Sequence, residues 1–117
     1  NTTLSCDTPC ISQETLYSKE PFTISLTLDN LDYYGILTAK VDSFIQSGRD
    51  VNLEPDEFHY ENNLCLAHNG TCVFQNMIIS YTSSGCMGFK VMGEHVSDFF
   101  LDCVEFYSHG MLFLIWD

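Results

Sequence analysis

Six cysteines in a chain of 117 residues are the feature that most limits how this protein can fold. The chain also carries two acceptor motifs for N-linked glycans, Asn1-Thr2-Thr3 and Asn69-Gly70-Thr71. An even number of cysteines together with such acceptors is typical of secreted and cell-surface proteins, because disulfides are rare in the cytosol. We therefore expect a secreted protein with candidate glycosylation sites at Asn1 and Asn69. All six cysteines are expected to form structural disulfides: Cys6, Cys10, Cys65, Cys72, Cys86 and Cys103.

The spacing of the cysteines does not fix how they pair. Cys6 and Cys10 are so close that a bond between them would close only a small loop, and each could instead tie residues 1–21 to a distant strand. Those residues otherwise look irregular, because they are mostly polar and contain two prolines. Cys65 and Cys72, if bonded to each other, would close a small loop that presents the second glycan acceptor.

Two strand-like segments, residues 85–92 and 98–107, flank a turn-like sequence. A turn centred between Glu94 and His95 would make them an antiparallel hairpin, in which opposite side chains stabilise each other. The predicted pairs are Cys86 with Cys103, Phe89 with Phe100, and Gly88 with Leu101. This register predicts a disulfide between Cys86 and Cys103.

Alternation of apolar and polar residues predicts two strands near the start of the chain. The first spans residues 22–28, and its apolar face consists of Phe22, Ile24, Leu26 and Leu28. The second spans residues 37–44, with an apolar face that contains Leu37, Ala39 and Val41. Residues 29–35 between them have turn chemistry, so we expect a hairpin.

The later segments give shorter signals. Val51 and Leu53 suggest a short strand that Pro55 ends, and residues 54–63 are expected to be an exposed connection. The predicted apolar face of the next strand is Val73, Met77, Ile79 and Tyr81. Residues 111–116 are expected to form a last buried strand or a junction to a further module.

Many short strands, few helical signals and the cysteines predict one all-β domain over residues 1–117. We expect a disulfide-bonded antiparallel β-sandwich of about seven or eight strands. Trp116 lies beyond Cys103 rather than between two distant cysteines, so an antibody-type domain is not supported. No apolar run approaches the roughly 20 residues that span a bilayer, and the first residues do not resemble a signal peptide. The chain is therefore expected to be a mature module of a longer extracellular protein, without direct membrane insertion.

Acidic residues dominate the charge of the chain. Sixteen Asp and Glu against four Lys and Arg give a formal net charge of −12. This charge opposes binding to nucleic acids and to anionic membranes. It would speed association with a strongly basic protein, an effect that added salt weakens. The alternative explanation is that the acidity only keeps the protein soluble.

Two acidic stretches contain aromatic side chains of the kind that anchor protein interfaces. The candidate partner-binding residues of the first stretch are Asp29, Asp32, Tyr33 and Tyr34. Those of the second stretch are Glu54, Asp56, Glu57, Phe58 and Tyr60. Packing in the core competes for each of these rings. Neighbouring copies of the same module are a second class of partner.

We expect no metal, cofactor or catalytic site. The four His residues are scattered, and Cys65 and Cys72 are further apart than the cysteines of a zinc knuckle. Asp29, Asn30 and Asp32 offer oxygen ligands for calcium, but they do not complete a calcium loop, and turn formation explains them more simply. The sequence contains no nucleophile elbow, phosphate-binding glycine loop or zinc-protease helix, so an enzyme is not expected.

Residues 76–88 and 99–107 resemble the ZP-N module of egg-coat proteins. In that family an apolar strand leads into a cysteine with an adjacent glycine, as near Cys86, and a later strand carries a tyrosine, as at Tyr107. The resemblance implies an immunoglobulin-like sandwich that belongs to an extracellular filament. The family includes the repeats of the vitelline-envelope receptor for lysin of molluscan eggs, and a strongly basic sperm protein recognises those repeats at fertilisation. A lysin-like basic protein is the partner that this resemblance implies.

The cysteines depart from the ZP-N pattern. Family members pair the first cysteine with the fourth and the second with the third, but this chain has six cysteines rather than four. The family's connectivity therefore cannot be transferred residue by residue.

A second resemblance implies a different function. The close pairs Cys6/Cys10 and Cys65/Cys72 around alternating strands are similar to those of the MD-2-related lipid-recognition and ganglioside-activator proteins. That resemblance implies a secreted lipid carrier whose sandwich opens to admit an acyl chain. A carrier needs a large apolar cavity, whereas a packed sandwich fills its interior with side chains. Lipid that co-purifies with the protein would favour the carrier.

Overall fold

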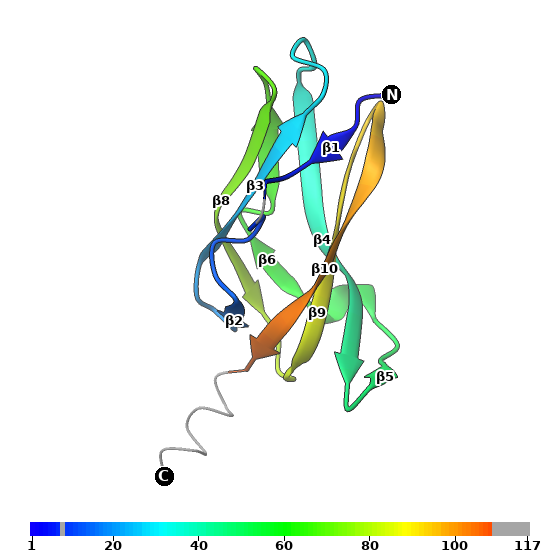
Figure 1. Ribbon diagram of the computed structural model, residues 1–117. Helices are drawn as coiled ribbons and strands as arrows, with labels where there is room; N and C mark the ends of the chain where they lie inside the picture. Colours follow the sequence, from blue (N-terminus) through cyan, green and yellow to red (C-terminus); the bar gives the residue numbers. More distant parts are fainter. Residues whose placement is uncertain (8, 109–117) are drawn as a thin grey trace.

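Two β-sheets form the layers of the structure, a computed structural model that describes residues 1–7 and 9–108 (Figure 1). The four-stranded sheet has the strand order β1-β3-β8-β6, and the six-stranded sheet has the order β2-β10-β9-β4-β5, with β7 also paired to β4. The strands are β1 (Leu4–Ser5), β2 (Thr15–Tyr17), β3 (Phe22–Leu28), β4 (Gly35–Gln46), β5 (Arg49–Asp50), β6 (His59–Glu61), β7 (Leu64–Ala67), β8 (Thr71–Ser80), β9 (Gly85–Gly93) and β10 (Val96–Tyr107). The described residues thus form an all-β, two-sheet fold as predicted, although with ten strands rather than seven or eight.

Apolar side chains from both sheets fill the space between the layers. β3 is buried as its alternation predicts, and the inward side chains are Phe22, Ile24, Leu26 and Leu28, each at most 5% exposed. The six-stranded sheet contributes, among others, the buried rings of Phe44, Phe89 and Phe106. Burial of each such side chain stabilises the fold by about 1.5–3 kcal/mol.

β3 and β4 lie in opposite sheets, so the predicted hairpin between them is wrong. β3 pairs with β1 and β8, whereas β4 pairs with β9, β5 and β7. Residues 29–34 therefore cross from one layer to the other at one end of the sandwich (Figure 1). Both strands have an apolar face, and two such faces can cover each other only from opposite layers.

A bulge in β8 overturns part of its predicted apolar face. The pairing of β8 with β3 shifts by one residue where Asn76 has a φ of 54°. Phe74 is buried before the shift, and Met77 and Ile79 are buried after it. Val73, predicted to point inward, is consequently 41% exposed. An extra residue in one strand reverses which side chains face the core.

β9 and β10 form the predicted hairpin, but the predicted register is wrong beyond the turn. Gly93 pairs with Val96, as a turn at residues 94–95 requires. β10 then accommodates one extra residue at each of two irregularities. As a result Leu101, rather than Phe100, lies opposite Phe89.

Three disulfides join the cysteines in sequential pairs, Cys6–Cys10, Cys65–Cys72 and Cys86–Cys103. The predicted Cys86–Cys103 bond is confirmed, but it is diagonal, because Cys86 lies opposite Glu105 in the ladder. The Cys65–Cys72 bond links β7 of one sheet to β8 of the other. The alternative in which Cys6 and Cys10 reach distant strands does not hold. Pairing of β1 with β3 and of β2 with β10 attaches the first residues instead.

Residues 51–63 differ from the prediction in two ways. Val51 and Leu53 follow the short strand β5 rather than forming one. The segment after them contains a 3-10 turn, η1 (Pro55–Glu57), and β6, and its Phe58 is only 7% exposed. It is therefore not an exposed connection throughout. The strand expected at residues 111–116 lies outside the described residues.

Candidate recognition surface

The loop between β3 and β4, residues 29–34, is held in shape by its own polar side chains. The Asn30 side-chain oxygen accepts a hydrogen bond of 3.0 Å from the Asp32 N–H, as expected for an Asx turn. The Tyr33 N–H donates to the Asn30 carbonyl at 3.2 Å. The Asp29 carboxylate accepts a bond of 2.8 Å from the Thr3 N–H. The carboxylate of Asp29 and the side chain of Asn30 are thus used to build the loop.

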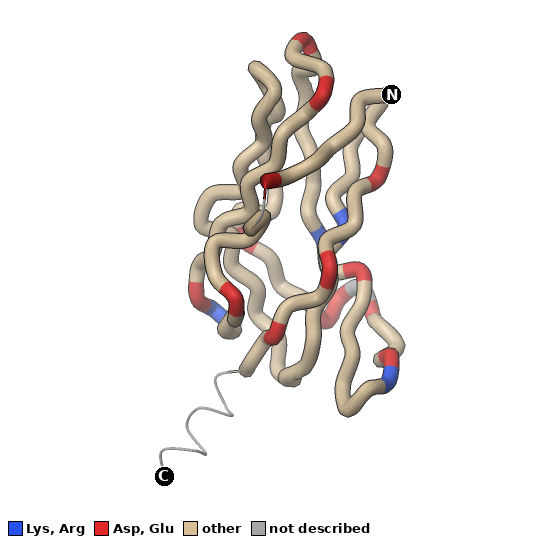
Figure 2. The backbone as a smooth tube through the Cα atoms, viewed as in Figure 1, with Lys and Arg blue, Asp and Glu red and all other residues tan. Residues whose placement is uncertain are grey.

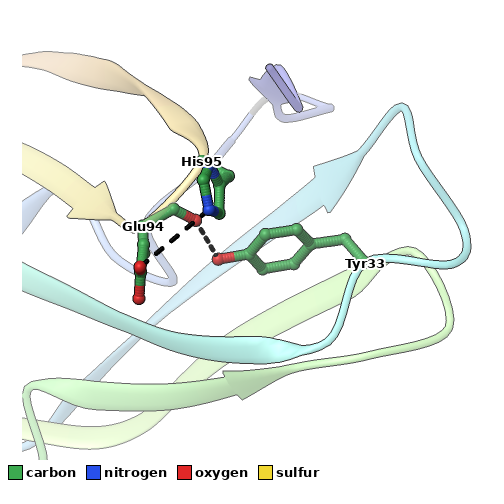
Figure 3. Close-up of polar contacts among 3 residues, drawn as sticks. All are labelled: Tyr33, Glu94 and His95. Atoms are coloured by element: carbon green, nitrogen blue, oxygen red, sulfur yellow. Dashed lines mark hydrogen bonds and ion pairs between the residues drawn. The ribbon is translucent and has the colours of Figure 1, made fainter.

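Tyr33 connects this loop to the tip of the β9–β10 hairpin. Its hydroxyl donates a hydrogen bond of 2.6 Å to the backbone carbonyl of Glu94, while the Glu94 carboxylate lies 3.9 Å from the His95 ring (Figure 3). A Cβ at Gly35 would come within 2.9 Å of the Tyr33 hydroxyl, so the glycine makes room for the ring. Tyr33 therefore supports the loop rather than standing free as an anchor.

Leu31 and Tyr34 are the freely exposed apolar side chains of the loop. They are 70% and 72% exposed, the highest values among the large apolar side chains of the described residues. Between them Asp32 is also exposed, and its carboxylate makes no bond to a described residue. Two exposed apolar side chains beside an unpaired carboxylate are suited to a partner that combines apolar and cationic groups.

The neighbouring strands extend this apolar area over the outer side of the six-stranded sheet. Ile36 of β4 is 55% exposed and lies opposite Leu66 of β7, which is 43% exposed. Leu64, two residues before Leu66 on the same face, is 57% exposed. We call the set Leu31, Tyr34, Ile36, Leu64 and Leu66 the apolar surface. Exposed apolar side chains gathered in this way mark interaction sites more often than scattered ones.

The predicted site residues did not include most of the apolar surface, although a signal was present. β7 reads Leu64-Cys65-Leu66-Ala67, which is apolar on both faces. A half-buried strand needs only one apolar face, and here Cys65 and Ala67 supply it. The other face, with Leu64 and Leu66, is therefore exposed.

The charge around the loop is negative. The loop contains Asp29 and Asp32, and Figure 2 shows red backbone at this end of the molecule. Glu94 lies in the turn between β9 and β10, where its carbonyl accepts the bond from Tyr33. The four Lys and Arg residues belong to segments outside the loop, and Figure 2 shows no blue backbone at this end; they are Lys19, Lys40, Arg49 and Lys90. The end that carries the β3–β4 loop thus has no Lys or Arg, whereas Leu64, at the far end of the apolar surface, lies opposite Thr38 and near the exposed Lys40.

The second predicted stretch is mostly engaged in packing. Phe58 stacks on Tyr81 with ring centroids 4.2 Å apart, and the Tyr60 hydroxyl accepts a bond of 2.9 Å from the Val41 N–H. Burial raises the pKa of Tyr60 above its usual range. Glu57 accepts a bond of 3.4 Å from the Tyr81 hydroxyl, and burial together with this carboxylate raises the pKa of Tyr81.

Only acids of the second stretch are freely exposed. The carboxylates of Glu54 and Asp56 are exposed, and neither carboxylate makes a bond to a described residue. η1 and β6 lie far along the sandwich from residues 29–34 (Figure 1). The structure therefore does not bring the two predicted stretches together, and only the first lies beside exposed apolar side chains.

The two candidate glycan acceptors lie on either side of the β3–β4 loop. Asn69 is exposed at the tip of the β7–β8 turn. Asn1 lines a shallow depression together with Asp29, Tyr33 and His95. The acceptors therefore occupy the same end of the sandwich as the apolar surface.

The described residues do not gather three or more His, Cys, Asp or Glu side chains where a metal ion could bind. Within the same residues, no helix is long and apolar enough to cross a membrane. No protein-family model, curated protein or solved structure matches the chain.

Proposed function

We propose that the chain is an extracellular recognition module of an egg-coat type matrix, and that it binds a basic protein through the apolar surface and its acidic surroundings. The observation that carries the proposal is the β3–β4 loop, where Leu31 and Tyr34 stand exposed beside Asp32. Three disulfides in a small domain are typical of extracellular proteins. The resemblance to ZP-N modules makes a lysin-type sperm protein the first partner to test.

The proposed mechanism divides the work between charge and apolar contact. The net charge of −12 attracts a basic partner over distance and raises the association rate. Leu31 and Tyr34 then bury their side chains in the partner and slow dissociation. Tyr33 contributes indirectly, because its bond to Glu94 keeps the loop in one shape.

Binding of a basic lysin-type protein, measured by calorimetry at low and at physiological salt, tests the proposal. We expect the affinity to fall as salt is added. In the double variant L31A/Y34A the free energy of binding should weaken by about 2 kcal/mol, the size of a typical interface hot spot. The matched control is V73A, which truncates another exposed apolar side chain that lies outside the apolar surface. Absence of binding at both salt concentrations, or equal binding by both variants, would contradict the proposal.

One observation favours a second candidate function, a lipid carrier. A surface groove of about 560 Å³ runs beside the Cys86–Cys103 disulfide, and Ile11, Leu101 and Val104 contribute to its lining. Such a groove is the place where an acyl chain would contact the protein. Native mass spectrometry of the purified protein tests this function, which predicts a bound lipid that organic extraction removes.

A further inference from the structure

The turn that carries Asn69 packs directly against the β3–β4 loop. The Leu28 N–H donates a hydrogen bond of 2.9 Å to the Gly70 carbonyl. A Cβ at Gly70 would come within 2.5 Å of the Leu31 side chain. The glycan acceptor is thus one residue away from a contact with a main anchor of the apolar surface.

The conformation of the turn presents Asn69 to solvent. Asn69 and Gly70 have φ values of 53° and 77°, as in the two-residue turns that close tight hairpins. The Thr71 hydroxyl donates to the His68 carbonyl at 3.2 Å, which fixes the far side of the turn. The Asn69 side-chain nitrogen lies 3.1 Å from a His68 ring nitrogen. Attachment of a glycan would replace one of its two hydrogens, and the other would remain for this contact.

We propose that an N-linked glycan on Asn69 covers the apolar surface and so controls the access of protein partners. In the modification, C1 of an N-acetylglucosamine forms a bond to the Asn69 side-chain nitrogen. The bond from C1 to a lipid diphosphate donor breaks, and the nitrogen loses one proton. The glycan then extends from a turn that lies beside Leu31 and directly follows β7. β7 carries Leu64 and Leu66 of the apolar surface. The control of partner access rests on the proposed function, whereas the covering of the apolar surface by the glycan is independent of that function.

A glycan at this place also has a physical reason that is independent of any partner. In the described residues, the ladder of β7 pairs only with β4, so its other edge is open. Open edges beside exposed apolar side chains favour association with other chains, and proteins often protect them. A hydrated glycan at the end of β7 would prevent such association while the surface is unused.

Asn1 offers a matched control on the other side of the loop. The Thr2 N–H donates to the His95 carbonyl at 3.0 Å, and the Ser97 N–H donates to the Thr2 carbonyl at 3.0 Å. These bonds hold Asn1 at the β9–β10 turn, two strands away from β7 in the sheet order. A glycan on Asn1 is therefore expected to leave Leu64 and Leu66 accessible, although Asn1 lies beside Asp29 and Tyr33 of the loop.

The test compares the protein secreted from eukaryotic cells with three variants. N69G removes the acceptor and keeps a residue that accepts the positive φ, T71V removes the acceptor motif without changing Asn69, and N1Q removes the control glycan. Intact mass before and after glycosidase treatment establishes which acceptors are occupied. Fluorescence of the neutral dye Nile red then reports accessible apolar surface, and calorimetry reports affinity for a basic lysin-type protein.

We expect N69G and T71V to increase both the Nile red signal and the affinity for the basic protein. The affinity should rise by about fivefold or more, which is the lower end of the coupling commonly measured between two sites. N1Q should change the Nile red signal and the affinity less than N69G and T71V do. An unoccupied Asn69, or wild-type values for N69G and T71V in both measurements, would overturn the inference. If the dye separates the variants but the basic protein binds none of them, the covering stands and the proposed function fails.

Discussion

The hydroxyl of Tyr33 donates a hydrogen bond of 2.6 Å to the backbone carbonyl of Glu94, 61 residues later in the chain. This bond joins the loop that crosses between the sheets to the tip of the β9–β10 hairpin (Figure 3). Tyr34, the residue after Tyr33, is 72% exposed, and the Tyr34 hydroxyl makes no bond to a described residue. Two adjacent tyrosines therefore differ: Tyr33 holds the loop, whereas Tyr34 is exposed and is the contact that we propose for a partner.

Replacement of Tyr33 by Phe should separate these roles. Loss of one hydrogen bond is expected to lower the free energy of unfolding by about 1 kcal/mol, measured by denaturant titration. The loop should also become less fixed, so a bound basic protein should dissociate faster. The matched control is Y34F, which removes an exposed hydroxyl and should keep the wild-type stability. Equal stabilities of the two variants would contradict the structural role of Tyr33.

Charge reversal at Asp32 should slow association with a basic protein. Its carboxylate is exposed and free, so D32K changes the charge without breaking the loop, whereas D29K would also remove the bond from the Thr3 N–H. The control is D50K in β5, an equal change of charge at the other end of the sandwich (Figure 1). We expect the association rate at low salt to fall more for D32K, by roughly threefold or more, and the difference to shrink at high salt. Equal rates for the two variants would show that only net charge matters.

The sequence predicted the elements whose signals are local. Alternation in residues 22–28 identified β3 with its buried face, and the turn at residues 94–95 identified the β9–β10 hairpin. The sheet to which β4 belongs was not predictable in the same way. Alternation shows which side chains share a face, but not which layer that face belongs to.

The recognition surface was predictable in composition but not in geometry. The acids and tyrosines of residues 29–34 were visible in the sequence, whereas the different roles of Tyr33 and Tyr34 depend on Glu94, far along the chain. The same holds for Leu66, which joins the surface only because β7 pairs with β4. Contacts between distant segments determine which exposed side chains act together.

The bulge at Asn76 is a local feature with a large effect on β8, and it can be tested. A β-branched residue is strained at the φ of 54° that Asn76 adopts, whereas glycine accepts it. We expect N76V to lower the free energy of unfolding by about 1–3 kcal/mol and N76G to change it far less. Thermal unfolding of the two variants checks this. The hydrogen bond of 2.8 Å from the Asn62 side chain to the Asn76 carbonyl uses the backbone, so either substitution can keep it. Equal destabilisation would argue against the bulge.

Tyr60 should make the fold sensitive to alkaline pH. Burial raises the pKa of its hydroxyl above the usual value of about 10, so the folded state holds this proton more tightly than the unfolded state. The stability that depends on this group is fully present below pH about 10 and is lost as the pH rises through the raised pKa. In Y60F this loss is absent, so the fall of stability above pH about 10 should be shallower than in the wild type.

At neutral pH the same variant should be less stable by about 1–2 kcal/mol, because the Val41 N–H loses its acceptor. Urea unfolding of the wild type and of Y60F at a series of pH values measures both effects. Burial raises the pKa of Tyr81, and the Glu105 carboxylate raises that of Tyr107, but both tyrosines are present in both proteins. The difference between the two curves therefore reports Tyr60. Parallel curves above pH about 10 would show that its hydroxyl titrates alike in the folded and unfolded states.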